Sequence, residues 1–278
     1  MKKIGQDIYS FCKSIFKINR SLTGEGVRET LGIIKIKLPD LKINEIPSGT
    51  KCFDWEIPKE WNVKDAYLKD FNGKKIIDFK KNNISLVGYS KPINQKISLK
   101  ELLPYLFTLP NQPFAIPYIT SYYKENWGFC ISENEKNNLQ EGEYEVFINS
   151  NLSEGSLTYG ELLIKGETDN EIFISTYICH PSLANDNLSG PVLATYLSKF
   201  INEIKNRYYS YRIIFIPETI GAIAYLSKNL NFLKTNVKAG FILTCVGDDN
   251  NYSFLPSRSG NTLSDKVALH VLNYSKKE

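Results

Sequence analysis

The sequence predicts an α/β fold in which a mostly parallel sheet, with helices on both faces, carries an inserted β-rich domain. From residue 172 onward, near-continuous apolar runs alternate with helical patterns, as in a parallel sheet that is covered on both faces. Between residues 53 and 163, short runs rich in Tyr, Phe and Trp alternate with turn signals instead. We therefore divide the chain into an N-terminal part of the α/β domain (1–52), the inserted domain (53–163) and the rest of the α/β core (164–278).

The elements before the insertion are two helices and a strand. Apolar residues recur at helical spacing between residues 4 and 18, and residues 20–26 have the composition of a turn. A second helix is expected over 27–36 because Pro39 closes it, and residues 41–46 alternate like a strand. Within the insertion, one short helix is expected at 99–106.

The α/β core repeats strand and helix three times. The strands are expected at 172–178, 211–216 and 240–246, and the helices at 188–204, 220–230 and 262–274. We expect the three strands to be adjacent and parallel, because each is joined to the next by a helix.

Composition limits the classes of function. The chain has 278 residues and a net charge of +4 from scattered charges, so a nucleic-acid partner is not indicated. The N-terminus has no signal-peptide pattern, and no apolar run reaches the ~18 residues of a membrane span. Five cysteines without a C-x-x-C pair favour a reducing compartment, and we expect a cytoplasmic protein. The oligomeric state stays open, a homo-oligomer included.

The strongest chemical signal lies where the three core strands end. The carboxyl ends of parallel strands meet at one edge of a sheet, which is where such folds bind ligands. The side chains expected to converge there are His180, Asp186, Glu218 and Asp248. Imidazole and carboxylate groups hold a hydrolytic zinc, and a carboxylate left uncoordinated can take a proton from water. For a His and an Asp alone, however, the commoner explanation is a hydrogen-bonded loop His and a helix-capping Asp.

Two other features have a structural explanation that is commoner than the functional one. Cys179 adjoins His180, but most such thiols are small core fillers. Residues 122–127 combine aromatic and charged groups and could form a substrate lip, although packing within a β domain produces the same pattern.

The loop Asp186-Asn187-Leu188-Ser189-Gly190 resembles the metal-bridging Asp loop of zinc-dependent aminopeptidases. This resemblance implies a zinc-exopeptidase-like fold with His180 as a zinc ligand, Asp186 as the bridging ligand and Glu218 as the general base. Four further segments resemble uncharacterised bacterial aminopeptidase-like proteins that are often found with polysaccharide-biosynthesis genes: 20–24, 53–62, 120–128 and 155–160. Those proteins carry a β-rich domain inserted into the peptidase fold.

The sequence departs from the aminopeptidase pattern at three places. Thr219 stands where a second Glu would bind metal, and a later Asp has no clear counterpart, with Asp248 a few residues on. The final His would lie beyond residue 278, and His270 is expected to be structural, so the chain looks shortened at its C-terminus. The resemblance thus implies a weakly held zinc and slow or absent hydrolysis of peptide or amide bonds.

A non-catalytic alternative is a binding or scaffold protein of surface-polysaccharide biosynthesis. The expected ligand is a small peptide, an amide or a sugar-linked molecule.

Overall fold

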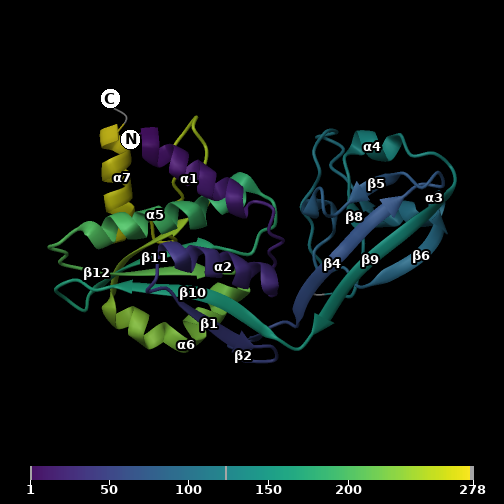
Figure 1. Ribbon diagram of the computed structural model, residues 1–278. Helices are drawn as coiled ribbons and strands as arrows, with labels where there is room; N and C mark the ends of the chain where they lie inside the picture. The colour runs from purple at the N-terminus through teal and green to yellow at the C-terminus, as the bar shows by residue number, and fades with distance from the viewer. Residues whose placement is uncertain (1, 123, 276–278) are drawn as a thin grey trace.

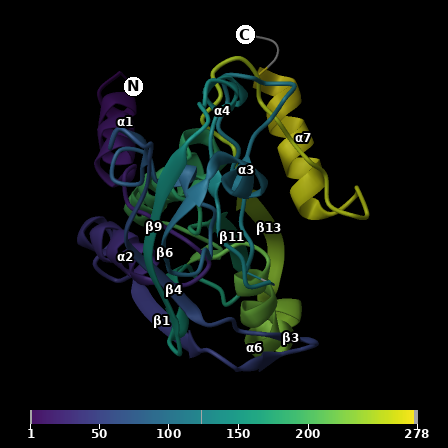
Figure 2. The same cartoon turned by 90° about the vertical axis from the view of Figure 1, so that its right-hand side faces the viewer.

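The computed structural model describes residues 2–122 and 124–275 and consists of an α/β lobe and a β lobe (Figure 1). The α/β lobe is built on one five-stranded sheet in the order β1-β10-β12-β11-β13. These strands are β1 (Lys42–Pro47), β10 (Ser156–Ile164), β11 (Glu171–Tyr177), β12 (Ser210–Ile216) and β13 (Val237–Leu243). In Figure 2, β1 and β13 lie on opposite sides of the lobe, as the strand order requires.

Strand direction divides this sheet into two parts. β12, β11 and β13 are parallel neighbours, which confirms the three adjacent parallel strands predicted from the sequence. β1 and β10 are antiparallel to each other, and β10 is antiparallel to β12, so the sheet is mixed rather than mostly parallel. The reason is that β10 begins at Ser156 and enters the sheet directly from the β lobe, without the crossover helix that a parallel neighbour needs.

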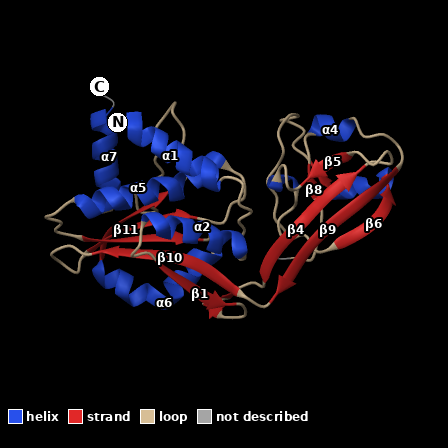
Figure 3. Ribbon diagram, in the orientation of Figure 1, coloured by secondary structure: helices blue, strands red, loops and turns tan. Residues whose placement is uncertain are grey.

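Helices cover both faces of the sheet, as predicted (Figure 3). Figure 1 shows α1 (Lys2–Ile15), α2 (Glu25–Lys37) and α5 (Ser189–Glu203) on one face, and α6 (Ile220–Asn236) on the other. α7 (Leu263–Ser275) follows β13. Alternate residues of β12 pack into the hydrophobic clusters on the two faces of the sheet, because successive side chains of a strand point to opposite faces. Ile213 and Phe215 belong to one buried cluster, and Ile214 and Ile216 to the other.

The β lobe is a four-stranded antiparallel sheet in the order β5-β4-β9-β6. Its strands are β4 (Glu60–Lys69), β5 (Lys75–Asp78), β6 (Ile93–Ser98) and β9 (Glu143–Ser153). The lobe also contains β7 (Leu106–Phe107), β8 (Phe129–Cys130), α3 (Leu99–Leu102), α4 (Glu133–Asn137) and two 3-10 turns, Asn83–Ser85 and Leu103–Tyr105. β2 (Lys51–Cys52) and β3 (Trp55–Glu56) form a two-stranded ribbon that packs on the α/β lobe instead, where Cys52 is buried with Ile214 and Ile216. The β lobe has its own core, in which Leu68, Phe129 and Tyr144 are buried together.

The chain passes from one lobe to the other twice, just before β4 and just before β10. Hydrogen bonds among three residues connect these two crossing segments. Arg28 of α2 donates to both carboxylate oxygens of Glu60, at 2.8 and 2.6 Å, and to Ser156 Oγ at 3.0 Å. The Ser156 N–H also donates to Glu60 Oε2, at 3.2 Å. We call Arg28, Glu60 and Ser156 the crossing clamp. Glu60 is the first residue of β4 and Ser156 the first residue of β10, so the clamp holds both crossing segments against α2.

Within the described ranges, no helix combines the length and the apolar character needed to cross a lipid bilayer.

Candidate functional site

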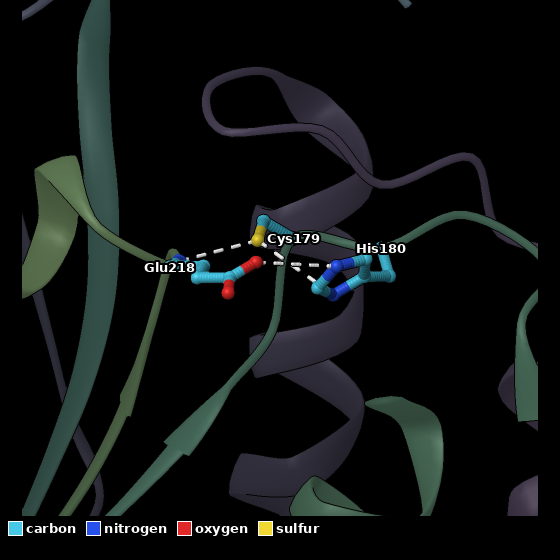
Figure 4. Close-up of side chains that lie close together, drawn as sticks. All are labelled: Cys179, His180 and Glu218. Atoms are coloured by element: carbon cyan, nitrogen blue, oxygen red, sulfur yellow. Dashed lines mark hydrogen bonds and ion pairs between the residues drawn. The ribbon is translucent and has the colours of Figure 1, made fainter. Parts of the chain in front are cut away.

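Strand register brings Cys179, His180 and Glu218 together. β11 and β12 run in parallel with Tyr177 opposite Ile216, and the Ile178 N–H donates to the Ile216 carbonyl at 3.1 Å. The two chains therefore leave the sheet side by side. Cys179, His180 and Glu218 each offer one metal-ligating atom, and these atoms lie within 4.8 Å of one another (Figure 4).

The His180 side chain contacts the side chains of both other residues in this cluster. His180 Nε2 lies 3.4 Å from Glu218 Oε2, and Cys179 Sγ lies 3.9 Å from His180 Nδ1. The Glu218 backbone N–H donates to Cys179 Sγ at 3.2 Å. The imidazole and the thiol are buried, whereas the Glu218 side chain is 45% exposed. Burial raises the pKa of the Cys179 thiol to about 12.

Asp186 lies outside this cluster, although its charge acts on the same region. It is exposed in the turn Ala184–Leu188, where its backbone is not helical, and a cis peptide bond joins it to Asn187. Burial chiefly raises the pKa of Tyr118, and charges that include Glu218 and Asp186 add to the effect. The Asp186 carboxylate is therefore close enough for its charge to act on this region, but it is not a member of the cluster.

Asp248 is not brought into the cluster. Its carboxylate is exposed and accepts hydrogen bonds from the Asn250 N–H and Nδ2, at 2.8 and 2.9 Å. The preceding chain turns at Cys245, which has a φ of 51°, and the Gly247 N–H donates to Asn185 Oδ1 at 2.8 Å. β13 is also separated from β12 by β11, so the third strand end is one strand farther from Glu218. Asp248 as a ligand therefore stays a prediction.

A cavity of about 140 Å³ lies between the two lobes and is lined by His180, Cys179 and Glu218. The β lobe supplies its opposite, largely aromatic wall, which includes Trp61, Tyr89, Tyr118 and Tyr122. The ring of Tyr118 lies 5.6 Å from that of His180, centroid to centroid. The inserted lobe therefore forms part of the site, of which the sequence pattern indicated only the possible lip at residues 122–127.

Of residues 122–127, interpreted as a substrate lip or as packing, residue 123 lies outside the described ranges, and the two outer aromatic residues divide between these roles. Tyr122 lines the cavity, whereas Trp127 is buried in the β lobe and stacks on Tyr105, with ring centroids 3.9 Å apart.

Arg20 holds the backbone of the His180 loop from the N-terminal segment. It is 3% exposed, and its guanidinium donates to the carbonyls of His180 at 2.7 Å, Pro181 at 3.1 Å and Ile15 at 2.8 Å. Burial lowers the pKa of Arg20 to about 10. The sequence showed Arg20 as part of a turn and of the segment 20–24 that resembles aminopeptidase-like proteins, but not its role, because its partners His180 and Pro181 lie about 160 residues away.

We expect Arg20→Leu to lower the free energy of unfolding by roughly 3 kcal/mol, because it leaves several buried carbonyls without a donor. Urea unfolding followed by circular dichroism measures this loss. Arg258→Leu, which removes an exposed guanidinium, serves as the control. Equal stability of the two variants would contradict the role assigned to Arg20.

Gly190 lets the Asp186 loop approach the sheet. A Cβ at this position would lie 2.4 Å from both Thr176 Oγ1 and the Leu243 carbonyl oxygen. We expect Gly190→Ala to cost about 1–3 kcal/mol, since the loop or the strand must move. Thermal unfolding of this variant should show the loss, whereas Gly32→Ala, in α2 with open space around it, should be neutral or stabilising.

Comparison with known protein families shows which family the chain belongs to. The profile of a family described as a domain of unknown function, DUF4910, matches residues 9–278. The chain belongs to this family. The DUF4910 chain is also 49% identical, over 268 residues, to a curated Clostridium acetobutylicum protein described as a "putative polysaccharide biosynthesis protein with aminopeptidase-like domain". This match covers 96% of the chain and 61% of the relative's length.

Solved structures place the DUF4910 chain in a known fold. It superposes with a TM-score of 0.93 and 49% identity on a crystal structure described as a "putative peptidase" from Clostridium acetobutylicum, covering 97% of this chain and 63% of that one. It also matches a zinc aminopeptidase from Bacillus subtilis, with a TM-score of 0.62 and 11% identity, over 96% and 77% of the respective chains. The second match shows a shared fold alone. Together these matches confirm the resemblance to bacterial aminopeptidase-like proteins linked to polysaccharide biosynthesis.

Proposed function

We propose that this chain carries a zinc-dependent hydrolase site that cleaves an amide bond beside a free amino group. The observation that carries this proposal is the 3.4 Å approach of the Glu218 carboxylate to His180 Nε2, at the carboxyl ends of two parallel strands. That edge is where α/β sheets bind ligands, and the cavity between the lobes opens the pair to a small substrate. The aromatic wall suits an aminoacyl, peptide or sugar-linked ligand.

The donor chemistry of the site fits zinc. Imidazole nitrogen and carboxylate oxygen are among its ligands in proteins, and the described cluster offers both. His180 and Asp186 would hold the ion, with Asp248 as a further, weaker candidate because Asn250 already engages its carboxylate. Thr219 supplies no carboxylate, so we expect the ion to be weakly held.

Glu218 has the position of the group that moves protons. A bound zinc supplies Lewis acidity toward the substrate carbonyl and lowers the pKa of water. Glu218 accepts the proton from the attacking water and returns it to the leaving amine. Its carboxylate is half exposed at the cavity, so it can reach both positions. Tyr118 lies across the cavity and helps to exclude bulk water from His180.

Metal content is the first test, because we expect turnover by this chain to be slow. The purified protein is loaded with zinc and dialysed, and the zinc per chain is measured by mass spectrometry. Wild type should retain zinc and His180→Ala should lose it. His270→Ala is a matched control, since the only other histidine is exposed on α7. Equal zinc in all three proteins would contradict the proposed site.

A scaffold function in surface-polysaccharide biosynthesis is the second candidate, and Thr219 favours it. This residue is exposed, has a φ of 57° and brings no metal ligand to the start of α6. Zinc binding without chelator-sensitive hydrolysis, across a panel of aminoacyl amides, would support this candidate over the first.

A further inference from the structure

Cys179 has no part in the site proposed above, although its sulfur contacts the imidazole. We propose that Cys179 Sγ is a ligand of the same metal ion that His180 holds. This inference rests on the proposed function and deepens it, because it makes the ion a sulfur-bound one. It also gives the site a donor that the Thr219 position does not provide.

Distances within the cluster are close to those of a metal shell. Zinc ligands at about 2.0–2.3 Å from a tetrahedral ion lie roughly 3.3–3.7 Å from one another. Cys179 Sγ lies 3.9 Å from His180 Nδ1, a little beyond this spacing, whereas Glu218 Oε2, 3.4 Å from His180 Nε2, keeps the proton-accepting position proposed above. These two contacts involve different nitrogens of the ring, and one nitrogen binds one ion. With one ligand atom taken from each residue, the three atoms lie within 4.8 Å of one another, so the donors would have to draw roughly 1 Å closer to share an ion. The half-exposed Glu218 side chain leaves room for that movement.

The surroundings of Cys179 differ from those of a core-filling thiol. Its sulfur accepts the Glu218 N–H and lies against an imidazole and a carboxylate, all at the wall of the cavity. Metals bind sulfur as the thiolate, so an ion held by Cys179 would displace the thiol proton. The sulfur is also buried, so a bound ion would be shielded from competing water on that side.

A sulfur ligand has a spectroscopic signature that is independent of activity. Cobalt(II) replaces zinc in such sites, and a cobalt–thiolate bond gives an intense near-ultraviolet charge-transfer absorption that nitrogen and oxygen ligands lack. Cobalt content and absorption are measured together on the full chain. We expect wild type to show this band in proportion to bound cobalt.

Two serine variants test which cysteine supplies the sulfur ligand. Cys179→Ser should lose the band and bind cobalt at least about tenfold more weakly. Cys130→Ser should keep both, and it is a matched control because Cys130 is another buried thiol that accepts a backbone N–H, from Ile119. Circular dichroism confirms that each variant is folded.

Each outcome bears on the proposal. Cobalt bound by wild type without the band overturns Cys179 as a ligand and leaves the proposed site at His180 standing. A band that persists in Cys179→Ser also overturns the proposal, because another sulfur must supply it. Wild type that binds no cobalt overturns both this proposal and the proposed function.

Discussion

Glu218→Gln is expected to lower chelator-sensitive hydrolysis of aminoacyl amides by about 10²–10⁴-fold while the zinc content stays near that of wild type. The amide has nearly the shape of the carboxylate but cannot accept a proton, and Glu218 lies 3.4 Å from the proposed zinc ligand His180. Because we expect slow turnover, the assay needs high enzyme concentration and long incubation, with zinc per chain measured on the same samples.

Glu203→Gln provides the control for this variant, since Glu203 is exposed at the end of α5 in the same lobe. Unchanged turnover in Glu218→Gln would show that another group handles the proton. Loss of zinc together with turnover would instead make Glu218 a ligand.

The second large effect concerns the crossing clamp. The hydrogen bonds from Arg28 hold the pKa of Glu60 at about 2, against the opposing effect of burial. Because this pKa is lower in the folded chain than in the unfolded one, the ionised Glu60 stabilises the fold above about pH 4.5. That contribution, on the order of 3 kcal/mol, is lost as the pH falls toward about 2.

Glu60→Gln should therefore be less stable than wild type at pH 7, and the difference should shrink as the pH falls toward 3. The free energy of unfolding in urea at both pH values measures this change. Glu154→Gln is the control, because Glu154 is 73% exposed and lies 3.6 Å from Lys59. A difference between wild type and Glu60→Gln that stays constant with pH would contradict the linkage to Glu60.

The sequence was sufficient to predict the parallel part of the sheet and one pair of the candidate site. β11, β12 and β13 are apolar runs separated by helical patterns, and parallel strands place their carboxyl ends at the same edge. The meeting of His180 and Glu218 follows directly from that geometry. It needs only neighbouring strands and no knowledge of side-chain packing.

Long-range contacts account for what the sequence could not predict. β10 has the same apolar and aromatic composition as the insertion before it, and only its pairing with β1 and β12 places it in the large sheet. Cys179 was interpreted as a core filler because nothing local shows that Glu218 donates to its sulfur. The same holds for Tyr118, which reaches His180 from the other lobe.

The pairing of β1 with β10 also has a consequence for synthesis on the ribosome. The partner of β1 emerges more than 100 residues later, whereas the four-stranded sheet of the β lobe is contiguous between Glu60 and Ser153. Contacts so distant in sequence form slowly, and contiguous units form first during translation. The β lobe should therefore fold before β1 has a pairing partner. β10 directly follows the last strand of this lobe, so it becomes available to pair with β1 once the lobe is complete.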